Sequence, residues 1–382
     1  MDAKEAARQR LERERERLID LSHRIHATPE LAFEEERSSA WTAEALSGAG
    51  FAVTPNVAGL PTAFTARAGE GPLRVAICAE YDCLPGIGHA CGHNIIAASA
   101  VGAAIAAAAV ADDLGLTVTV VGTPAEESGG GKIILLEDGV FAGQHAAMMV
   151  HPAPYDAVRR PLLAMTQFGV TYRGKASHAS AYPELGVNAA DALTVAQTAI
   201  GLLRQHLRPA DRVHGIVTHA GDAPNVVPAL ATATYQVRAT TVDDLDDVYR
   251  KVRRCFDAGA LATGAELSVE EAWKPYAEMR HDAELATLYR ANAERLGRTF
   301  SDTVEAKPPA ASTDMGNVSQ MLPSIHPFVG IDSSPAVNHE PAFAAHCVTP
   351  AADKALADGA LGLAWTAIDI ASDESLAARL MG

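Results

Sequence analysis

Six side chains that could build a metal-centred active site follow the predicted strands of this chain. They are Cys91 and His93, Glu126 and Glu127, His151, and His339. One polar residue after one strand is common, but polar residues after several parallel strands meet at the same edge of a sheet. Thiolate, imidazole and carboxylate groups are the donors that zinc and neighbouring transition metals bind. The pattern therefore predicts a metal site at a sheet edge.

The segment Cys91-Gly92-His93 is the most specific of these signals. Glycine lets the backbone bend sharply, so that the thiolate and the imidazole can face the same ion. The alternative is a buried cysteine beside a turn that begins a helix. His89, two residues earlier, is a third donor, a partner of a ligand, or neither.

Glu126 and Glu127 lie between a predicted strand and the glycines 129–131. Adjacent glutamates usually belong to a solvated turn, but two carboxylates at a strand end can divide the work of hydrolysis. One binds metal, while the other accepts a proton from the nucleophilic water and passes it to the leaving amine. We assign Glu126 as the base and Glu127 as the ligand, although their spacing does not determine the order.

His151 ends the predicted strand 146–150 and precedes Pro152, which we expect to stop further strand pairing. His151 is a ligand or a core histidine, and its neighbours favour the ligand. His339 by itself resembles a surface-loop histidine, and only the number of other donors makes it a candidate. A mixed S, N and O donor set beside a free glutamate fits a one- or two-metal hydrolytic centre better than a structural zinc site.

Other catalytic signatures are missing from the sequence. It contains no Gly-x-Ser-x-Gly elbow, no phosphate-binding loop and no dinucleotide fingerprint. Serine-hydrolase, nucleotide and nicotinamide chemistry are therefore not leading hypotheses.

The candidate ligands lie in a part of the sequence where strand and helix patterns alternate. The predicted elements are a strand at 73–79, a helix at 94–111, a strand at 116–121, a short helix at 132–137 and a strand at 146–150. This alternation predicts a mostly parallel α/β sheet. Between about 164 and 272 the order becomes β-α-β-β-α-β, which is typical of a ferredoxin-like α+β unit. We expect a catalytic α/β domain, residues 1–163 and 273–382, with an inserted domain, 164–272. A helix at 281–297, a buried strand at 324–331 and a closing helix at 350–372 complete the catalytic domain.

Length and charge limit the partners of the chain. A chain of 382 residues favours two domains. The net charge of −16, from 47 acidic and 31 basic residues, argues against nucleic acid or an anionic membrane as partner. The apolar run 95–111 is short and Ala-rich, so we expect a buried helix there rather than a membrane span.

The termini and cysteines indicate the compartment. The charged N-terminus has no apolar signal core, so we expect a cytoplasmic protein. The five cysteines have no spacing typical of a disulfide framework, which leaves Cys91 free to bind metal.

The inserted domain carries three further candidates: His178, Asn225 and Arg238. Each has an ordinary explanation as an exposed turn or surface side chain. The functional interpretation is that Arg238 binds a substrate carboxylate and that His178 donates to a developing oxyanion.

Together these motifs resemble the aminoacylase/carboxypeptidase G superfamily of metallopeptidases and amidohydrolases, which includes the indole-acetyl-amino acid hydrolases. The likeness runs from HATPE at 26–30 to His339, and it is strongest in AEYDCLPGIGHACGHN at 79–94, GTPAEE at 122–127, KASHAS at 175–180 and STDMGNVS at 312–319. These segments are most similar to the Xaa-Arg (β-alanyl-lysine) dipeptidase branch. Asn94, where many relatives have aspartate, favours that branch, and Cys83 stands where alanine is usual.

The resemblance implies two divalent metal ions, with zinc favoured and manganese or cobalt as alternatives. Their ligands would be Cys91, His93, Glu127, His151 and His339, with Glu126 as general base and Asp82 orienting a ligand. It also implies that the inserted domain is a lid and a homodimerisation domain, that His178 reaches the partner subunit's site, and that Asn225 and Arg238 hold the substrate's carboxylate end.

The leading hypothesis is a hydrolase that cleaves the amide bond of an N-acyl amino acid or a dipeptide. One alternative is an aminobenzoyl-glutamate type amidase with the same centre. The other is a metal-binding protein without catalysis, which the free Glu126 argues against.

Overall fold

The structure, a computed structural model, describes residues 2–305 and 311–382 of the chain. The described residues form two compact units, each of which is considered separately. The first contains residues 2–160, 279–305 and 314–382, and the second contains 161–278 and 311–313. The main segment of the second unit, 161–278, thus begins three residues before the insertion expected from the sequence and ends six residues after it.

The first unit is built around a six-stranded sheet with the order β1-β2-β4-β3-β5-β11. Strand β3 pairs in parallel with β4 and β5, β11 pairs in parallel with β5, and β1 and β2 add an antiparallel edge. The strands are β1 (Ala52–Pro55), β2 (Phe64–Ala68), β3 (Leu73–Ala79), β4 (Leu116–Gly122), β5 (Ala146–Met148) and β11 (Ser324–Ile325). This arrangement confirms a mostly parallel α/β unit.

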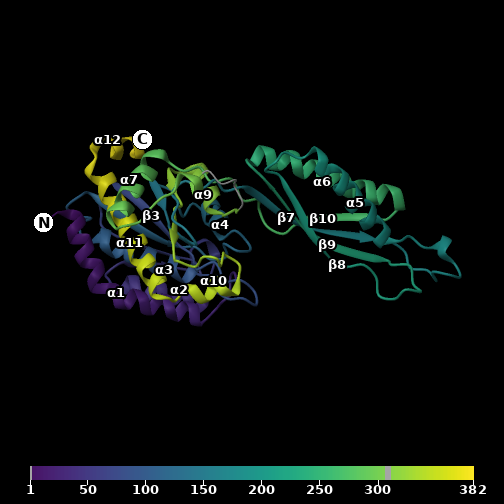
Figure 1. Cartoon of the computed structure of the whole chain (residues 1–382), viewed down its shortest axis with the longest axis horizontal. Helices are drawn as coiled ribbons and strands as arrows, with labels where there is room; N and C mark the ends of the chain where they lie inside the picture. Colours follow the sequence, from purple (N-terminus) through teal and green to yellow (C-terminus); the bar gives the residue numbers. More distant parts are fainter. Residues whose placement is uncertain (1, 306–310) are drawn as a thin grey trace. The chain divides into compact units, whose positions relative to one another are not determined.

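The helices of the first unit surround this sheet (Figure 1). They are α1 (Ala3–Ala27), α2 (Glu36–Gly48), α3 (His93–Ala108), α4 (Gly131–Glu137), α7 (Ala283–Arg295), α8 (Asp302–Glu305), α9 (Met315–Met321), α10 (Pro341–His346), α11 (Pro350–Ser372) and α12 (Glu374–Met381). Helix α3 is apolar on all sides and packs between α1 and α11. Small side chains allow this close packing: a Cβ on Gly102 would lie 2.9 Å from Leu11 and Leu18. Within the described residues, no helix has the length and apolar character to cross a membrane.

Two expected strands differ from those in the structure. The segment 146–150 continues into a separate strand β6 (His151–Ala153), and the segment 324–331 divides into β11 and β12 (Phe328–Gly330). The expectation that Pro152 ends pairing is wrong, because β6 pairs in parallel with β12 through Pro152. The ladder uses the amides of His151 and Ile331, so it needs no donor from the proline.

The second unit has the antiparallel sheet order β10-β7-β9-β8, with α5 and α6 on one face (Figure 1). Its elements are β7 (Ala164–Arg173), α5 (Ala189–Leu203), β8 (Arg212–His219), β9 (Leu230–Ala239), α6 (Val242–Thr263) and β10 (Glu266–Glu271). Helix α5 begins where expected, because the Asn188 side chain accepts from the amides of Ala190 and Asp191. Strand order and connections confirm the ferredoxin-like insertion.

Candidate metal centre

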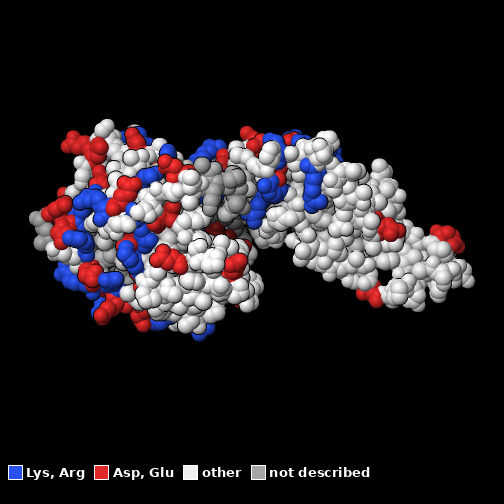
Figure 2. Space-filling model, viewed as in Figure 1, with Lys and Arg blue, Asp and Glu red and all other residues white. Residues whose placement is uncertain are grey.

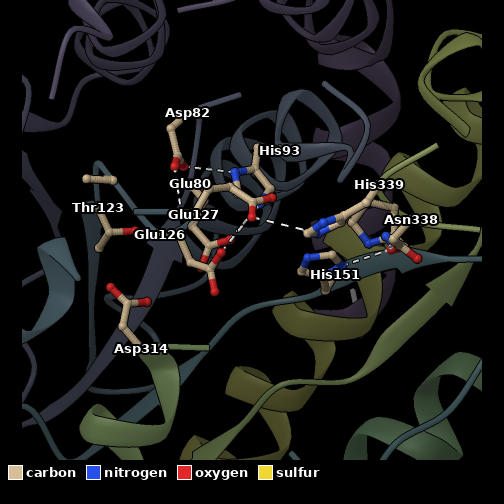
Figure 3. Close-up of polar contacts among 12 residues, drawn as sticks. Glu80, Asp82, His93, Thr123, Glu126, Glu127, His151, Asp314, Asn338 and His339 are labelled. Carbon is tan, nitrogen blue, oxygen red and sulfur yellow. Dashed lines mark hydrogen bonds and ion pairs between the residues drawn. The ribbon is translucent and has the colours of Figure 1, made fainter. Parts of the chain in front are cut away.

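The donors expected from the sequence converge at the carboxyl edge of the first unit's sheet (Figure 3). Cys91 and His93 come from the segment after β3, Glu126 and Glu127 from the segment after β4, and His151 from the start of β6. His339 comes from the loop before α10. Because β3 and β4 are parallel neighbours, their following loops open on the same side of the sheet.

Three groups of three donors lie close enough to hold an ion, and two of them share Cys91. Cys91, His93 and His151 form one group, and Cys91, Glu127 and His339 form the other. In each group the candidate ligand atoms lie within 4.8 Å of one another. Cys91 belongs to both groups, so its side chain is within reach of both sets of donors. His89 belongs to neither group.

The turn at Gly92 lets Cys91 take part in both donor groups. Gly92 has φ +77° and caps the N-terminus of α3, so Cys91 and His93 turn inward on either side of it. A Cβ at this position would lie 2.5 Å from Cγ of Pro152, the residue that follows His151. The glycine therefore lets the β3–α3 segment approach β6.

The hydrogen bonds of the buried His93 and the half-buried His151 leave the same ring nitrogen of each available. Nδ1 of His93 lies 2.8 Å from Asp82 Oδ1, and Nδ1 of His151 lies 2.8 Å from the Pro152 carbonyl oxygen. These oxygens accept, so each Nδ1 donates, and in the neutral form of each ring the lone pair lies on Nε2. His93 Nε2 is buried and has no hydrogen-bond partner among the described residues. Both side chains thus fit ligands that bind an ion through Nε2.

Burial and neighbouring charges shift the pKa values of Cys91 and His151 in opposite directions. Burial, and then the carboxylates of Glu127 and its neighbours, raises the pKa of Cys91 well above its usual range. Burial, followed by the positive charge of His93, lowers the pKa of His151 to about 4, so its ring is neutral. Divalent ions favour a deprotonated thiol and a neutral imidazole, so this donor set fits them.

His339 is exposed, but hydrogen bonds join its loop to the segment that carries Cys91 and to the strand that carries His151. Its amide donates to the Ala90 carbonyl oxygen at 2.9 Å, and the neighbouring Asn338 side chain donates to the Pro152 carbonyl oxygen at 3.1 Å. Its Nε2 lies 3.7 Å from Glu127 Oε2. The backbone of His339 has φ +70°, which orients the ring toward the site.

Glu126 lies beside the two groups but in neither of them. It is buried, and a third set of close donors joins it to Glu80 and His93. Burial, then the charges of Glu80 and Glu127, raises the pKa of Glu126 well above the usual carboxyl range. A higher pKa makes its carboxylate a stronger base, as proton transfer from water requires.

Asp82 connects two of the ligand segments. One oxygen receives the hydrogen bond from His93, and the other accepts from the amide of Glu127 at 2.9 Å. Figure 3 shows both contacts. Asp82 is thus situated to orient the His93 ring and the Glu127 backbone together.

Sequence reasoning missed a buried ion cluster behind the site. Lys132 Nζ lies 2.6 Å from both Glu80 Oε1 and Asp314 Oδ1, and all three side chains are fully buried. A lysine near a helix start usually lies on the surface, and no local pattern links it to residue 314. The one available signal was Glu80, an acid directly after a buried strand.

The three candidates of the insertion all lie in the second unit. His178 and Asn225 are exposed and close together, because the amide of Ala179 donates to the Asn225 carbonyl oxygen. Arg238 donates to Ser312 Oγ at 2.9 Å. Asn225 precedes Leu230 at the start of β9, and Arg238 lies eight residues along that strand, about 26 Å at ~3.3 Å per residue. Within one chain, the structure therefore does not bring Asn225 and Arg238 together.

Gly92→Ala is expected to reduce metal binding and to destabilise the protein by about 2–4 kcal/mol. The alanine would have to adopt the positive φ of Gly92, and its Cβ would displace Pro152. Gly139→Ala is the matched control, because Gly139 has φ +79° with no atom within 4 Å of the added Cβ. It should cost only about 1–2 kcal/mol and leave metal content unchanged. Metal analysis and thermal unfolding compare them; equal metal content in both variants would contradict the role given to Gly92.

Comparison with known proteins finds a peptidase family and a set of hydrolases. The model of peptidase family M20/M25/M40 matches residues 76–357. Xaa-Arg dipeptidase of Mus musculus is 39% identical over 96% of this chain and 88% of its own length. A p-aminobenzoyl-glutamate hydrolase chain of Escherichia coli is 36% identical over 68% of this chain and 58% of its own length. A dinuclear metal binding M20 peptidase of Bacillus subtilis shares the fold, with TM-score 0.71, 24% identity and coverage of 94% and 99% of the two chains.

Proposed function

Since the chain belongs to peptidase family M20/M25/M40, we propose that it is a two-metal hydrolase that cleaves the amide bond of a dipeptide or an N-acyl amino acid. The observation that carries this proposal is the pair of donor groups sharing Cys91, with Glu126 beside them and in neither of the two. A mixed sulfur, nitrogen and oxygen donor set next to a further acid suits a hydrolytic centre better than a structural metal site.

Cys91, His93 and His151 would hold one ion, and Cys91, Glu127 and His339 the other. Two divalent ions, when bound, would polarise the amide carbonyl and lower the pKa of a water molecule. Zinc is the favoured metal, with manganese or cobalt as alternatives, because this mixed donor set suits all three.

The protein's own residues then move the proton. Glu126 accepts it from the attacking water and passes it to the nitrogen of the leaving amine. Asp82 holds the His93 ring through Nδ1 and the Glu127 backbone through its amide, which keeps both groups in place during the reaction. Such positioning lowers the barrier by avoiding reorganisation.

A dipeptide with a free carboxylate is the preferred substrate class. The 39% identity with a protein named Xaa-Arg dipeptidase supports it. Arg238 would bind the substrate carboxylate through its planar guanidinium, together with Asn225. An aminobenzoyl-glutamate type conjugate is the second candidate, since a relative named for hydrolysis of that compound is 36% identical.

A homodimer would complete the site. The distance between the Asn225 loop and Arg238 along β9 supports this, because only two chains could bring these residues to one substrate. In our proposal, one subunit supplies Arg238, and the partner supplies His178 and Asn225. His178 would donate to the developing oxyanion.

Strand β8 is the surface proposed for the second copy. It is the last strand of its sheet, and its backbone N–H and C=O groups on the outer side have no neighbouring strand among the described residues. Ile216 and Val217 on it are exposed, at 67% and 43%. Figure 2 shows few charged side chains over this part of the second unit. An open edge that carries exposed apolar side chains favours pairing with an identical edge.

Mixing two inactive variants tests the shared site. His178→Ala and Arg238→Ala should each be nearly inactive as homodimers. After unfolding and refolding together, about a quarter of the sites should recover, because random pairing gives half heterodimers with one intact site each. If size-exclusion chromatography shows dimers and no activity returns, the residues act within one chain and the proposal is wrong.

A hydrolysis screen tests the reaction itself. The metal-loaded protein is incubated with β-alanyl and other dipeptides ending in arginine or lysine, with N-acetyl and long-chain N-acyl amino acids, and with aminobenzoyl-glutamate. Release of a free amino acid from the dipeptides is the expected result. Release only from aminobenzoyl-glutamate supports the second candidate, and no release with full metal content would leave a metal-binding protein without catalysis.

A further inference from the structure

The connector between α1 and α2 contacts the loop that carries Glu126 and Glu127. Glu35, at the end of this connector, is fully buried, and its Oε1 accepts a hydrogen bond of 2.8 Å from the amide of Ala125. The two residues are 90 positions apart in the sequence. A buried carboxyl group is costly unless it has specific partners, so its contact with a backbone amide 90 positions away requires a reason.

That reason lies in the conformation of Ala125. Its φ is +60°, in the left-handed region that residues with a Cβ rarely adopt. Ala125 directly precedes Glu126, so its conformation sets the direction in which the Glu126 side chain leaves the backbone. The hydrogen bond to Glu35 offsets the cost of this conformation.

Two carboxyl groups hold the backbone on either side of Glu126. Glu35 accepts from the amide of Ala125, and Asp82 accepts from the amide of Glu127 at 2.9 Å. Ala125 is also held through its carbonyl oxygen, which accepts from Gly130 at 3.0 Å. The backbone around residue 126 is therefore held from both sides, while its side chain faces the donors (Figure 3).

From these backbone contacts on both sides of Glu126 we infer that Glu35 is a positioning residue for the general base Glu126. The inference rests on the proposed hydrolytic function. Glu35 acts through the backbone of Ala125 and touches no reacting atom, so it should affect the rate of turnover and not the binding of metal or substrate.

Further contacts of the same connector support this assignment. The Phe33 ring lies against Gly129, where an added Cβ would come within 2.3 Å of Phe33 Cε2. The carbonyl oxygen of Glu30 accepts from the amide of Cys83 at 2.9 Å. The connector thus contacts both the β4–α4 and the β3–α3 segments, and we call these contacts the brace. Glu35 supplies the contact of the brace that lies next to Glu126.

The pKa of Glu35 is compatible with this role. Burial, and then the negative charge of Asp82, raises it to about 7. Both the ionised and the neutral carboxyl group present an oxygen that can accept from Ala125, so the contact does not depend on ionisation. Glu35→Leu is consequently expected to fold, since it fills the space and removes a costly buried acid.

The test compares Glu35→Leu with Glu30→Leu in the metal-loaded full-length protein. Glu30 belongs to the same connector, but its side chain accepts from the amides of Arg37 and Ser38 at the start of α2. Glu35→Leu should lower kcat about 10- to 100-fold with KM and metal content unchanged. Glu30→Leu should lower the unfolding temperature and leave kcat within about twofold of the parent. Equal effects of the two variants on kcat would overturn the inference.

Three more variants separate positioning from a general loss of structure. Glu35→Gln keeps an acceptor oxygen and should keep kcat within about threefold. Glu35→Asp shortens the side chain by one methylene, so its oxygen no longer reaches the Ala125 amide. Its kcat should fall as much as that of Glu35→Leu. Adding Ala125→Gly to Glu35→Leu should recover part of kcat, because glycine adopts positive φ without strain. Full activity of a folded Glu35→Asp variant, or no recovery with glycine, would contradict the role.

Hydrogen exchange supplies a measurement that does not depend on turnover. In the metal-free protein, Glu35→Leu should raise amide exchange in peptides covering 123–131 and leave β7–β10 unchanged. If the parent protein hydrolyses nothing, the proposed function fails while this measurement still tests the brace. Unchanged exchange in 123–131 would overturn the brace even in an active enzyme.

Discussion

Glu126→Gln is expected to bind metal as the parent protein does and to lose about 10²- to 10⁴-fold in kcat. The amide has nearly the same shape as the carboxyl group but cannot accept a proton from water. Glu126 is buried and lies outside both groups that share Cys91, so its replacement removes no proposed ligand of either ion. The measurements are metal content after dialysis and steady-state hydrolysis of the best dipeptide from the screen.

Glu127→Gln is the matched comparison, because it makes the same change at the adjacent residue. Glu127 belongs to the group with Cys91 and His339, so this variant should lose about one metal equivalent along with its activity. Sequence spacing alone does not distinguish the two glutamates. If Glu126→Gln lost metal and Glu127→Gln kept it, the roles would be reversed, and near-normal turnover in Glu126→Gln would exclude it as the base.

Cys91→Ala is expected to abolish tight binding of both ions and with it essentially all activity. Cys91 belongs both to the group with His93 and His151 and to the group with Glu127 and His339. Its loss therefore leaves each of these groups with two donors. The apparent unfolding temperature should then no longer rise when zinc is added, because an ion stabilises a protein only through binding to its folded state. Metal analysis and thermal unfolding with and without zinc measure both effects.

Cys83→Ala is the control for Cys91→Ala. Cys83 is also buried and lies eight residues earlier, but it belongs to no donor group among the described residues. This variant should keep both metal equivalents and the zinc-dependent rise in unfolding temperature. If Cys91→Ala also bound two equivalents tightly, the shared thiolate would be wrong.

Local patterns accounted for much of the fold. The apolar run at 73–79 matches β3 in full, and Asn188 correctly marked the start of α5, because side-chain periodicity and caps act over a few residues. Errors arose at two prolines: Pro152 does not end strand pairing, and Pro327 separates β11 from β12. There the hydrogen-bond partners come from distant segments, which local periodicity does not report.

Residue types and their order in the sequence by themselves determined the chemistry of the donor set: a thiolate and an imidazole around Gly92, two adjacent carboxylates, and two later histidines. Only the tertiary structure decided that Cys91 is common to two groups of donors, that Lys132 is buried between Glu80 and Asp314, and that Glu35 holds Ala125. The physical reason is the range of the interactions. A side chain's donor chemistry belongs to the residue itself, whereas contacts between segments many residues apart depend on how the sheet and its connectors pack.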